Sequence, residues 1–462
     1  MTQPPIDILI VSVNARYSHC SFAARSLLAN LGPLADTTRI LETDLDITPL
    51  QLASQITEAR PRVAGFSVYL WNVRLVEATA RILRIAAPGL RLVAGGPELT
   101  ADYPNAALFD AVIIGEGESA FRIFCEQALG RDTDATPPLH APEPENLATL
   151  ALPYDLYTDT DLARRTAYVE TSRGCPCGCT YCTSARTGLR LFPLDRILPA
   201  LDTLWTRGLR RFKFLDRSFN APVGHACAIL DFFRDRVTPD TCLHFEINAD
   251  NLHTDIAERI AAFPPGTLHL EVGIQTLNPR VAAVIGRSPD TRRTLGNLRF
   301  LTRQTGATVH ADLIFGLPGE DETSFARGFN ELIATCAPPE VQVNLLKGLP
   351  GTRIARDAAA LGLAFSPEPP YDLLRSDVMD FATLTRMQHF ARCWELVHNR
   401  GHFPEMIPAL HASGGGDIYG VYRALADRIH AAEGKLFAIA RPRLAAILRE
   451  HLGERELGVS RR

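Results

Sequence analysis

Residues 167–182 read AYVETSRGCPCGCTYC and hold four of the ten cysteines of the chain. The alternating start of this stretch predicts a short strand, which leads into a loop with two glycines that allow tight turns. Cys175, Cys179 and Cys182 are separated by three and then by two residues. Three such thiolates can hold three irons of a [4Fe–4S] cluster and leave one iron open to an outside ligand. We therefore predict that these three cysteines bind an iron–sulfur cluster.

A structural zinc site is the alternative for the same cysteines. Zinc favours four sulfur ligands, and Cys177 would make a fourth. Structural zinc sites, however, usually draw pairs of ligands from two separate segments, and the sequence has no second Cys-x-x-Cys pair. The sequence favours the cluster, with Cys177 as an inert neighbour; a role for Cys177 as a false ligand during cluster assembly stays open.

The segments around the cysteines predict a partial barrel over residues 165–370. Apolar strand patterns alternate with amphipathic helical patterns, and six such β/α units favour an open (β/α)6 barrel over a closed barrel of eight. Active residues of such barrels lie at the carboxyl ends of the strands. The expected strands are 167–171, 212–215, 243–247, 268–272, 309–315 and 341–345, and the expected helices are 194–206, 225–236, 292–302 and 322–335.

Residues 1–130 predict a separate α/β domain. Five strand patterns alternate with helical patterns, which is typical of a doubly wound, Rossmann-like parallel sheet. Ligands bind such sheets outside the carboxyl ends of the strands. The expected strands are 7–13, 38–41, 63–68, 90–94 and 111–114, and the expected helices are 21–31, 49–59 and 73–86.

Two further regions complete the expected organisation. Residues 131–164 are predicted to be a linker, because residues 131–146 are rich in proline, acidic and small residues. Residues 371–462 are predicted to be helical, with amphipathic stretches at 383–397 and 418–433 and a flexible break at 411–417.

Composition limits the class of protein. The chain of 462 residues has a formal net charge of −4 and no dense run of Lys or Arg, so nucleic acid is an unlikely partner. No segment approaches the ~20 apolar residues of a membrane span, and the N-terminus does not have the pattern of a signal peptide. We expect a cytoplasmic protein whose scattered cysteines are reduced.

The cysteine spacing, with Tyr181 before the last cysteine, resembles the radical S-adenosylmethionine (SAM) superfamily. The resemblance implies that the open iron of the cluster binds SAM, and that one electron cleaves SAM to a 5′-deoxyadenosyl radical. It also implies a reductase such as flavodoxin or ferredoxin as electron donor.

Later segments are similar to the strand ends of the same superfamily. They are FKFLDRSFN at 212–220, HFEIN at 244–248, EVGIQ at 271–275 and DLIFGLPG at 312–319. The resemblance implies contacts with SAM, and the alternatives are a turn cap for Asp216 and a surface position for Arg287. The residues implied to contact SAM are Asp216, Glu246, Gln275, Arg287 and Asp312.

The first domain resembles the cobalamin-binding domain that precedes many radical SAM barrels. The matching segments are VNARYSH at 13–19, SVYLWN at 67–72, GGPE at 95–98 and IIGEGE at 113–118. The mutase pattern Asp-x-His-x-x-Gly is absent, so the resemblance does not imply a histidine ligand to cobalt. The alternative is a degenerate domain that only packs on the barrel. The residues implied to bind cobalamin are Asn14, Tyr69, Trp71, Gly95, Gly96, Gly115 and Glu116.

Taken together, the chain resembles cobalamin-dependent radical SAM proteins, including a subgroup with an uncharacterised helical C-terminal extension. The resemblance implies a methyltransferase that acts on an unactivated centre of an unknown substrate. The alternatives are a radical cyclase, a rearranging enzyme or an oxidoreductase with the same cofactors, and a non-catalytic corrinoid or iron–sulfur sensor.

Overall fold

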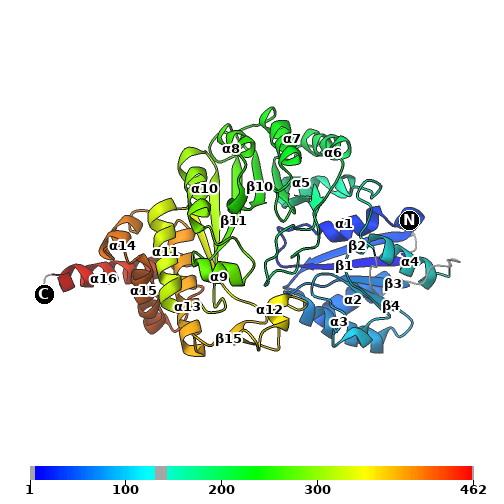
Figure 1. The fold of residues 1–462 in the computed structure, drawn as a ribbon. Helices are drawn as coiled ribbons and strands as arrows, with labels where there is room; N and C mark the ends of the chain where they lie inside the picture. The colour runs from blue at the N-terminus through cyan, green and yellow to red at the C-terminus, as the bar shows by residue number, and fades with distance from the viewer. Residues whose placement is uncertain (1–5, 131–142, 460–462) are drawn as a thin grey trace.

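The computed structural model describes residues 6–130 and 143–459. Figure 1 shows an N-terminal α/β domain, a second sheet with helices on its outer side, and a helical C-terminal region. The expected fold class, a Rossmann-like domain followed by a partial (β/α)6 barrel and a helical extension, is confirmed. The part of the expected linker at residues 131–142 lies outside the described residues.

The N-terminal sheet is parallel, with strand order β2-β1-β3-β4-β5. All seven residues of β1 are buried, as expected for a central strand with helices on both faces. The strands are β1 (Ile8–Asn14), β2 (Thr38–Asp44), β3 (Val63–Ser67), β4 (Arg91–Gly95) and β5 (Ala111–Ile113).

Side-chain capping marks the start of α1, at Ser21, and of α2. Thr48 and Gln51 form a reciprocal capping box at the start of α2, and Pro49 occupies the first helical turn. The helices are α1 (Phe22–Ala29), η1 (Gly32–Thr37), α2 (Pro49–Ala59), α3 (Val73–Ala86), η2 (Ala106–Leu108) and α4 (Glu118–Ala128).

The second sheet has six parallel strands in the order β13-β12-β11-β10-β9-β6. Burial alternates residue by residue along β10, β11 and β12, so one face packs on the helices and the other lines the inside of the barrel. The strands are β6 (Ala167–Val169), β9 (Arg211–Phe214), β10 (Cys242–Ile247), β11 (Leu268–Gln275), β12 (Thr308–Phe315) and β13 (Glu340–Leu345).

Helices cover the outer face of this sheet. All four expected helices are present, although their ends shift by up to a few residues, and α8 is an additional one. The helices are α6 (Leu194–Thr206), α7 (Val223–Arg234), η4 (Ala249–Asn251), α8 (Thr254–Ala261), α9 (Pro279–Val284), α10 (Thr291–Gln304), α11 (Glu322–Cys336) and α12 (Arg353–Arg356).

Both edges of the partial barrel are covered by other parts of the chain. On β6, the peptide N–H of Thr166 donates to Ser18 O at 2.7 Å, and His19 forms a parallel bridge with Thr166. On β13, the Asn399 side chain accepts from the N–H of Val341 at 3.1 Å and donates to its carbonyl at 2.9 Å. The flanking regions therefore satisfy the backbone groups that an open edge would expose.

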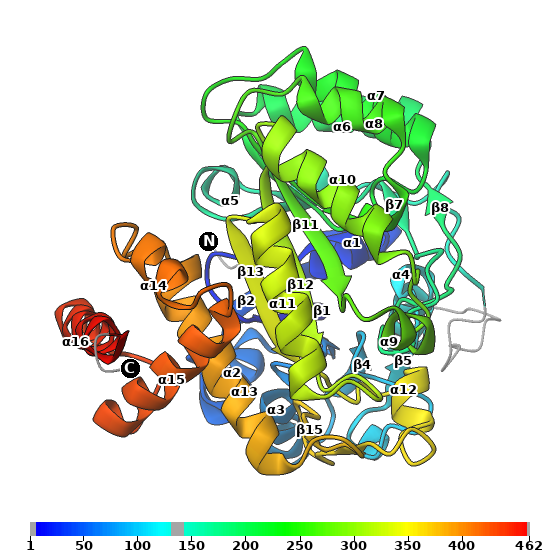
Figure 2. The ribbon, with the colours of Figure 1, turned by 60° about the vertical axis from the view of Figure 1, so that its left-hand side comes forward.

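The C-terminal region is helical from residue 381 onward. A small antiparallel pair, β14 (Ala364–Phe365) and β15 (Leu373–Arg375), precedes it. The expected break at 411–417 is partly wrong, because α14 extends to Ser413 and only the four residues after it are non-helical. The helices are α13 (Phe381–Trp394), the π-helix η5 (Glu395–Asn399), α14 (Ile407–Ser413), α15 (Ile418–Glu433) and α16 (Arg441–Val459). Figure 2 shows α13 next to α11, with α16 farther away.

The second half of the expected linker belongs to the barrel, which corrects the predicted domain boundary. Leu147, Leu150, Tyr154 and Tyr157 are buried in the barrel core, and the segment includes η3 (Tyr154–Leu156) and α5 (Asp159–Arg164). The linker prediction extends to residue 164 because the residues at its start are rich in proline.

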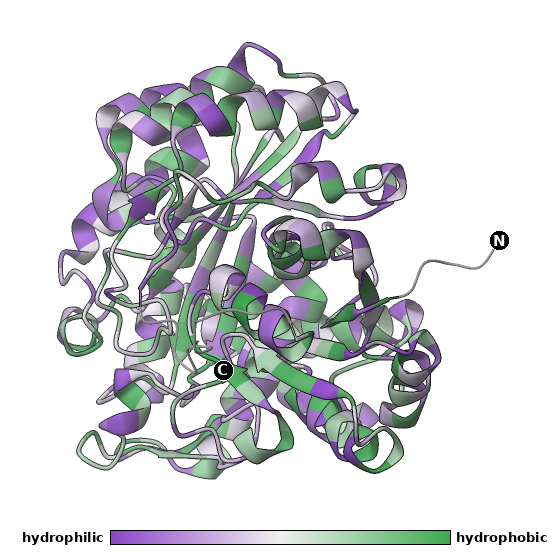
Figure 3. Cartoon of the chain, turned by 90° about the vertical axis from the view of Figure 1, so that its right-hand side faces the viewer, coloured by the Kyte–Doolittle hydropathy of each residue, from purple (hydrophilic) through white to green (hydrophobic). Residues whose placement is uncertain are grey.

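Hydropathy follows the layers of the fold. Figure 3 shows helices with one hydrophilic and one hydrophobic side, which is the pattern of helices packed on a sheet. Within the described residues, no helix is both long enough and apolar enough to cross a bilayer.

Candidate cofactor site

A small hairpin presents the cysteine loop at the carboxyl end of β6. Strand β7 (Ser172–Arg173) pairs with β8 (Arg190–Leu191), and the loop between them carries the four clustered cysteines. Gly174 has φ +86°, and a Cβ there would lie 1.7 Å from the carbonyl oxygen of Gly188. Glycine is therefore required at the entry to the loop.

The loops after later strands hold the cysteine loop in place. The N–H of Thr180 donates to Ile285 O, and the N–H of Ile354 donates to Thr180 O, both at 2.9 Å. Gly286 has φ +75°, and a Cβ there would lie 2.3 Å from the carbonyl oxygen of Gly178. The loop is thus fixed by the barrel mouth.

The positions of the cysteine sulfurs can be compared with those expected around a single zinc ion. All ten cysteines are free, and Cys175 and Cys179 are buried while Cys182 is half-buried. Zinc bonded to several thiolates at about 2.3 Å would bring their sulfurs to within about 3.8 Å of one another. Among the described residues, no three cysteine sulfurs lie within 4.8 Å of one another. The cysteine sulfurs are therefore not gathered around one zinc-sized point, and cluster binding by these three cysteines stays a prediction.

Arg287 lies beside the cysteine loop, where SAM would bind the cluster. Its Nη1 is 3.9 Å from Cys179 Sγ, and its Nη2 donates to the Gly273 carbonyl at 2.6 Å and pairs with Asp250 at 3.2 Å. This guanidinium places a positive charge beside the Cys179 sulfur. The expected contact of Arg287 with the SAM carboxylate stays a prediction.

Cys177 contacts both the cysteine set and a residue outside it. A hydrogen bond with the Cys175 thiol lowers the pKa of Cys177 to about 6. The Nδ2 of Asn248, which follows β10, donates to Cys177 Sγ at 3.4 Å. The interpretation of Cys177 as an inert neighbour of the cluster stays a prediction.

Asp216 already has partners within the protein. Its carboxylate accepts hydrogen bonds from the N–H and hydroxyl of Thr171 at 3.1 and 2.6 Å and from the Ser172 hydroxyl at 2.5 Å, and the residue is 1% exposed. These bonds fix the turn that leads from β6 to the cysteine loop. Asp216 thus has a structural role at the start of the cysteine loop, and its contact with SAM stays a prediction.

The other two acidic residues expected to contact SAM line the inner face of the barrel and already have protein partners. Glu246 pairs with Arg217 at 3.4 Å, and burial raises its pKa. Asp312 lies 3.3 Å from Nε2 of His310. Neither carboxylate requires a cofactor to satisfy it, and their contacts with SAM stay predictions.

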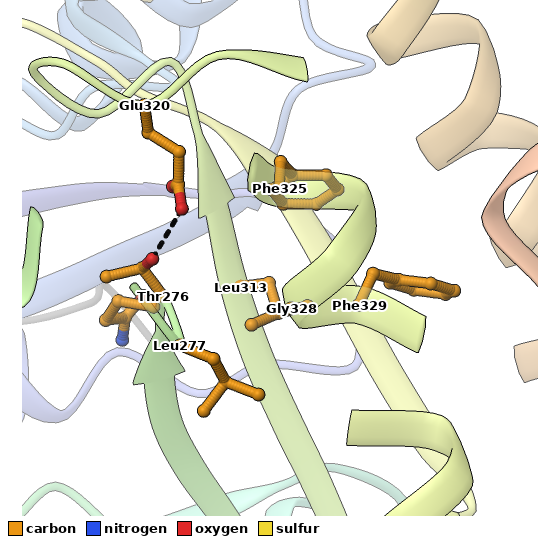
Figure 4. Close-up of a pocket in the computed structure, with 8 residues that line it drawn as sticks. Thr276, Leu277, Leu313, Glu320, Phe325, Gly328 and Phe329 are labelled. Atoms are coloured by element: carbon orange, nitrogen blue, oxygen red, sulfur yellow. Dashed lines mark hydrogen bonds between the residues drawn. The ribbon is translucent and has the colours of Figure 1, made fainter. Parts of the chain in front are cut away.

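Gln275 ends β11 in a strained conformation. Its φ is +69°, the register with β12 shifts beside it, and its Oε1 is buried with no partner among the described residues. It borders a cavity of about 10 Å³, which holds about one water molecule and is far too small for SAM. Figure 4 shows this cavity, where the Thr276 hydroxyl donates to Glu320 at 2.7 Å.

A cavity of about 1140 Å³ lies between the N-terminal domain and the barrel. Its walls include the carboxyl ends of β1, β3, β4 and β5, the inner face of β6 and the residues that flank the cysteine loop on both sides. One chamber therefore joins the ligand edge of the first domain to the cysteine loop. All seven residues expected to bind cobalamin line it, namely Asn14, Tyr69, Trp71, Gly95, Gly96, Gly115 and Glu116.

Aromatic rings form one wall of this cavity. Tyr69 and Trp71 stack with their ring centroids 4.4 Å apart and 6° between the planes, and the indole N–H donates to Val13 O at 3.1 Å. Trp71 is still 47% exposed. The wall thus offers a flat, anchored surface to a large planar ligand.

We expect Gly96→Ala to lower the free energy of unfolding by about 1–3 kcal/mol, because φ at this position is +130°. The added Cβ would also lie 2.3 Å from the Val68 carbonyl. Gly95→Ala is the matched control, since its Cβ would lie 3.6 Å from the nearest atom, an ordinary contact. Denaturant unfolding of both variants checks this prediction, and an equal effect at the two positions would contradict it.

The side chains of Asn14 and Glu116 are held by the protein. The Asn14 amide donates to His19 O at 2.8 Å and to Glu42 at 2.9 Å. Glu116 pairs with Arg173 at 3.1 Å and with Arg190. Both residues line the cavity, and their contact with cobalamin stays a prediction.

Sequence reasoning missed the groups that join the two domains here. Tyr168 and Glu170 line the cavity from β6 and the turn after it, and burial raises the pKa of Glu170 to about 7. The Tyr168 hydroxyl contacts Nδ1 of His19 at 2.5 Å, and Arg173 pairs with carboxylates of both domains. The alternation of residues 167–171 could have placed Tyr168 on the inner face, but not its partner from another domain.

The fold and the cysteine loop together define a radical SAM protein with a second cofactor-type domain. Family models agree: a B12 binding domain matches residues 8–124, and the radical SAM superfamily matches residues 169–330. The chain belongs to the radical SAM proteins that carry a B12-binding domain, which confirms the resemblance seen in the sequence.

Two curated relatives and one solved structure are similar to this chain over 66–98% of its length. The chain is 25% identical over 70% of its length to 2-(S-pantetheinyl)-carbapenam-3-carboxylate methyltransferase of Streptantibioticus cattleyicolor, covering 52% of that protein. It is 26% identical over 66% of its length to the cobalamin-dependent radical SAM methyltransferase TokK of Streptomyces tokunonensis, covering 49%. The chain thus spans about half the length of these relatives. The solved structure of the cobalamin-dependent radical enzyme OxsB matches 98% of the chain and 80% of OxsB, with a TM-score of 0.66 and 12% identity, which shows the shared fold.

Proposed function

We propose that this chain is a cobalamin-dependent radical SAM enzyme, and specifically a methyltransferase that acts on an unactivated centre of its substrate. The observation that carries the proposal is the single cavity of about 1140 Å³, which touches both the ligand edge of the B12-binding domain and the cysteine loop. Two cofactors and a substrate group can meet only where both sites open into one space. The names of the two curated relatives support the same reaction type.

When bound, the cluster with SAM supplies a radical that can remove hydrogen from an unreactive carbon, and cobalamin supplies a carrier for a methyl group. The chain's own residues would hold and orient these groups. Cys175, Cys179 and Cys182 would bind three irons, and Arg287 would balance negative charge beside Cys179.

The residues of the interdomain cavity would position the large ligand and keep water away from the reacting atoms. Tyr69 and Trp71 present a flat aromatic wall, and the backbone at Gly96 packs directly on Val68. Tyr168 and Glu170 close the barrel side of the same space. Enclosure of this kind protects a reactive radical from side reactions.

We propose a small electron-transfer protein, such as flavodoxin or ferredoxin, as the source of the electron. The substrate must be able to reach the interdomain cavity.

The test is anaerobic reconstitution of the full chain with iron, sulfide, cobalamin, SAM and a reductant. We expect S-adenosylhomocysteine to form beside 5′-deoxyadenosine once a substrate is present, because methyl transfer and hydrogen removal consume SAM in two ways. Mass spectrometry of both products measures this outcome.

The same product analysis separates the alternatives. 5′-Deoxyadenosine without S-adenosylhomocysteine would favour a cyclase, rearranging enzyme or oxidoreductase. The protein could also bind the cluster and the corrinoid without cleaving SAM under conditions that reduce the cluster. That result would favour a sensor and would contradict the proposed enzymatic function.

A further inference from the structure

Three neighbouring strands of the barrel each carry a histidine followed two residues later by an acid. The pairs are His244 and Glu246 on β10, His269 and Glu271 on β11, and His310 and Asp312 on β12. The residues between them, Phe245, Leu270 and Ala311, are almost fully buried against the helices. The six polar side chains therefore face the inside of the barrel.

Strand pairing brings some of these side chains close together at the amino-terminal end of the sheet. His244 is in register with His269, and His310 is in register with Glu340, the first residue of β13. The rings of His244 and His269 stack with centroids 4.6 Å apart, and those of His269 and His310 are 6.1 Å apart. The cysteine loop lies at the other, carboxyl-terminal end of the barrel.

Three of these residues converge on one point. Glu340 Oε2 lies 3.3 Å from His310 Nδ1 and 3.9 Å from His269 Nε2, and one ligand atom of each residue lies within 4.8 Å of the others. Around a tetrahedral ion with bonds of about 2.0–2.2 Å, ligand atoms lie about 3.3–3.5 Å apart. Within residues 6–130 and 143–459, no other set of His, Cys, Asp and Glu side chains is this compact.

Carboxylates lie behind two of the histidines. His310 has Asp312 Oδ1 3.3 Å from its second ring nitrogen, Nε2, and His244, which stacks on His269, binds Glu271 at 2.8 Å. Histidines that bind a metal usually direct their other ring N–H at a carboxylate, which fixes the ring and its tautomer. At His310 the carboxylate of Asp312 lies within reach of Nε2, which makes no hydrogen bond in this structure.

The charge of the inner face also favours a cation. Four carboxylates, on Glu246, Glu271, Asp312 and Glu340, face two cations, Lys213 at 4.0 Å from Glu271 and Arg217 at 3.4 Å from Glu246. A divalent ion would balance the excess. The side chains of His269 and Glu340 are 25% and 37% exposed, so an ion can reach them from solvent.

We propose that His269, His310 and Glu340 bind a divalent transition-metal ion, with zinc the best match to two imidazoles and one carboxylate. Three protein ligands leave one position for water or for an oxygen or nitrogen of a small molecule inside the barrel. The site is separate from the cysteine loop, and none of its three ligands lines the large cavity. It does not depend on the proposed methyl transfer.

The test uses the full chain, purified anaerobically with its cluster and supplied with zinc alone. Elemental analysis should find about one zinc per chain after dialysis. Zinc X-ray absorption should show nitrogen and oxygen neighbours at about 2.0–2.2 Å and no sulfur at about 2.3 Å. Sulfur neighbours, or no retained zinc, would overturn the proposal, because the first result would assign the ion to the cysteines.

Variants identify the ligands. His269→Ala and Glu340→Gln should each reduce bound zinc to background with iron content unchanged, and Asp312→Asn should weaken zinc binding by about 10–100-fold. His402→Ala, which removes an exposed histidine, is the matched control and should retain zinc. Circular dichroism checks folding. Zinc retained by both ligand variants would overturn the proposal, and the wild-type absorption spectrum still decides it if a variant does not fold.

Discussion

Replacement of Cys175, Cys179 or Cys182 by alanine is expected to abolish the visible absorption of the iron–sulfur cluster and all SAM cleavage. Each of the three thiolates would bind one iron, so each replacement leaves one iron without its protein ligand. Iron analysis, absorption spectra and the yield of 5′-deoxyadenosine after anaerobic reconstitution measure the effect. The expected loss is complete for each single variant.

Cys177→Ala is the matched control, because it removes a thiol from the same loop. We expect it to retain both the cluster and SAM cleavage, since Cys177 Sγ has Asn248 as a partner at 3.4 Å and the Cys-x3-Cys-x2-Cys spacing does not need it. A colourless protein that binds zinc and releases it in all four variants would refute the cluster. Loss of the cluster in Cys177→Ala alone would instead make Cys177 a ligand.

The sequence predicted the strands well because burial imposes simple periods on them. The uninterrupted apolar run of β1 follows from burial on both faces, and the alternation along β10 to β12 follows from one helix-facing and one inward face. The Cys-x3-Cys-x2-Cys loop was equally visible, because its ligands are local in the chain. Residues whose partners are local were therefore predicted best.

Roles that depend on distant parts of the chain were not visible. Asp216 was expected to contact SAM, but its partners Thr171 and Ser172 belong to the turn after another strand. Glu116 was expected to bind cobalamin, but arginines of the cysteine hairpin hold it. The pairs of Asp216 depend on the pairing of β6 with β9, and those of Glu116 depend on the relative placement of the two domains. Periodicity carries no information about either.

The histidine–acid pairs of the barrel are visible in the sequence, but no site was predicted from them. His-x-Glu or His-x-Asp recurs on three consecutive strands, and a period of two places all six side chains on one face. Their convergence with Glu340 depends on strand register, which the sequence does not fix. The pattern alone could therefore have indicated a polar inner face, but not a metal site.

Arg173→Leu is expected to destabilise the folded chain by about 3–5 kcal/mol, because it leaves buried carboxylates without their cation. Arg173 is 11% exposed and pairs with Glu118 at 2.6 Å, Glu170 at 3.0 Å and Glu116 at 3.1 Å. Glu116 and Glu118 belong to the N-terminal domain, whereas Glu170 follows β6. The variant thus removes the charge that joins the two walls of the cavity. Denaturant unfolding at neutral pH measures the loss.

Arg62→Leu is the matched control, since Arg62 is 56% exposed and lies 3.9 Å from Asp7. An exposed pair of this kind contributes about 0–1 kcal/mol, so the two leucine variants should differ by several-fold. Comparable losses would show that Arg173 acts only as an ordinary surface charge. Arg173→Lys should fall between the wild type and Arg173→Leu, because lysine keeps the charge but cannot reach three carboxylates at once.

The pH dependence of the Arg173→Leu effect provides the sharper test of its cause. Burial alone would raise the pKa of Glu118, but Arg173 and the Ser26 hydroxyl, which donates at 2.7 Å, lower it overall. A carboxyl whose pKa is lowered on folding contributes stability above its ordinary pKa, and that contribution is lost as the pH falls through the folded value. Protonated carboxyls no longer need Arg173, so the wild type and Arg173→Leu should converge in stability below about pH 4. A difference that stays constant down to that pH would mean that Arg173 stabilises the protein through packing, including its guanidinium 5.8 Å from the Phe192 ring, and not through charge.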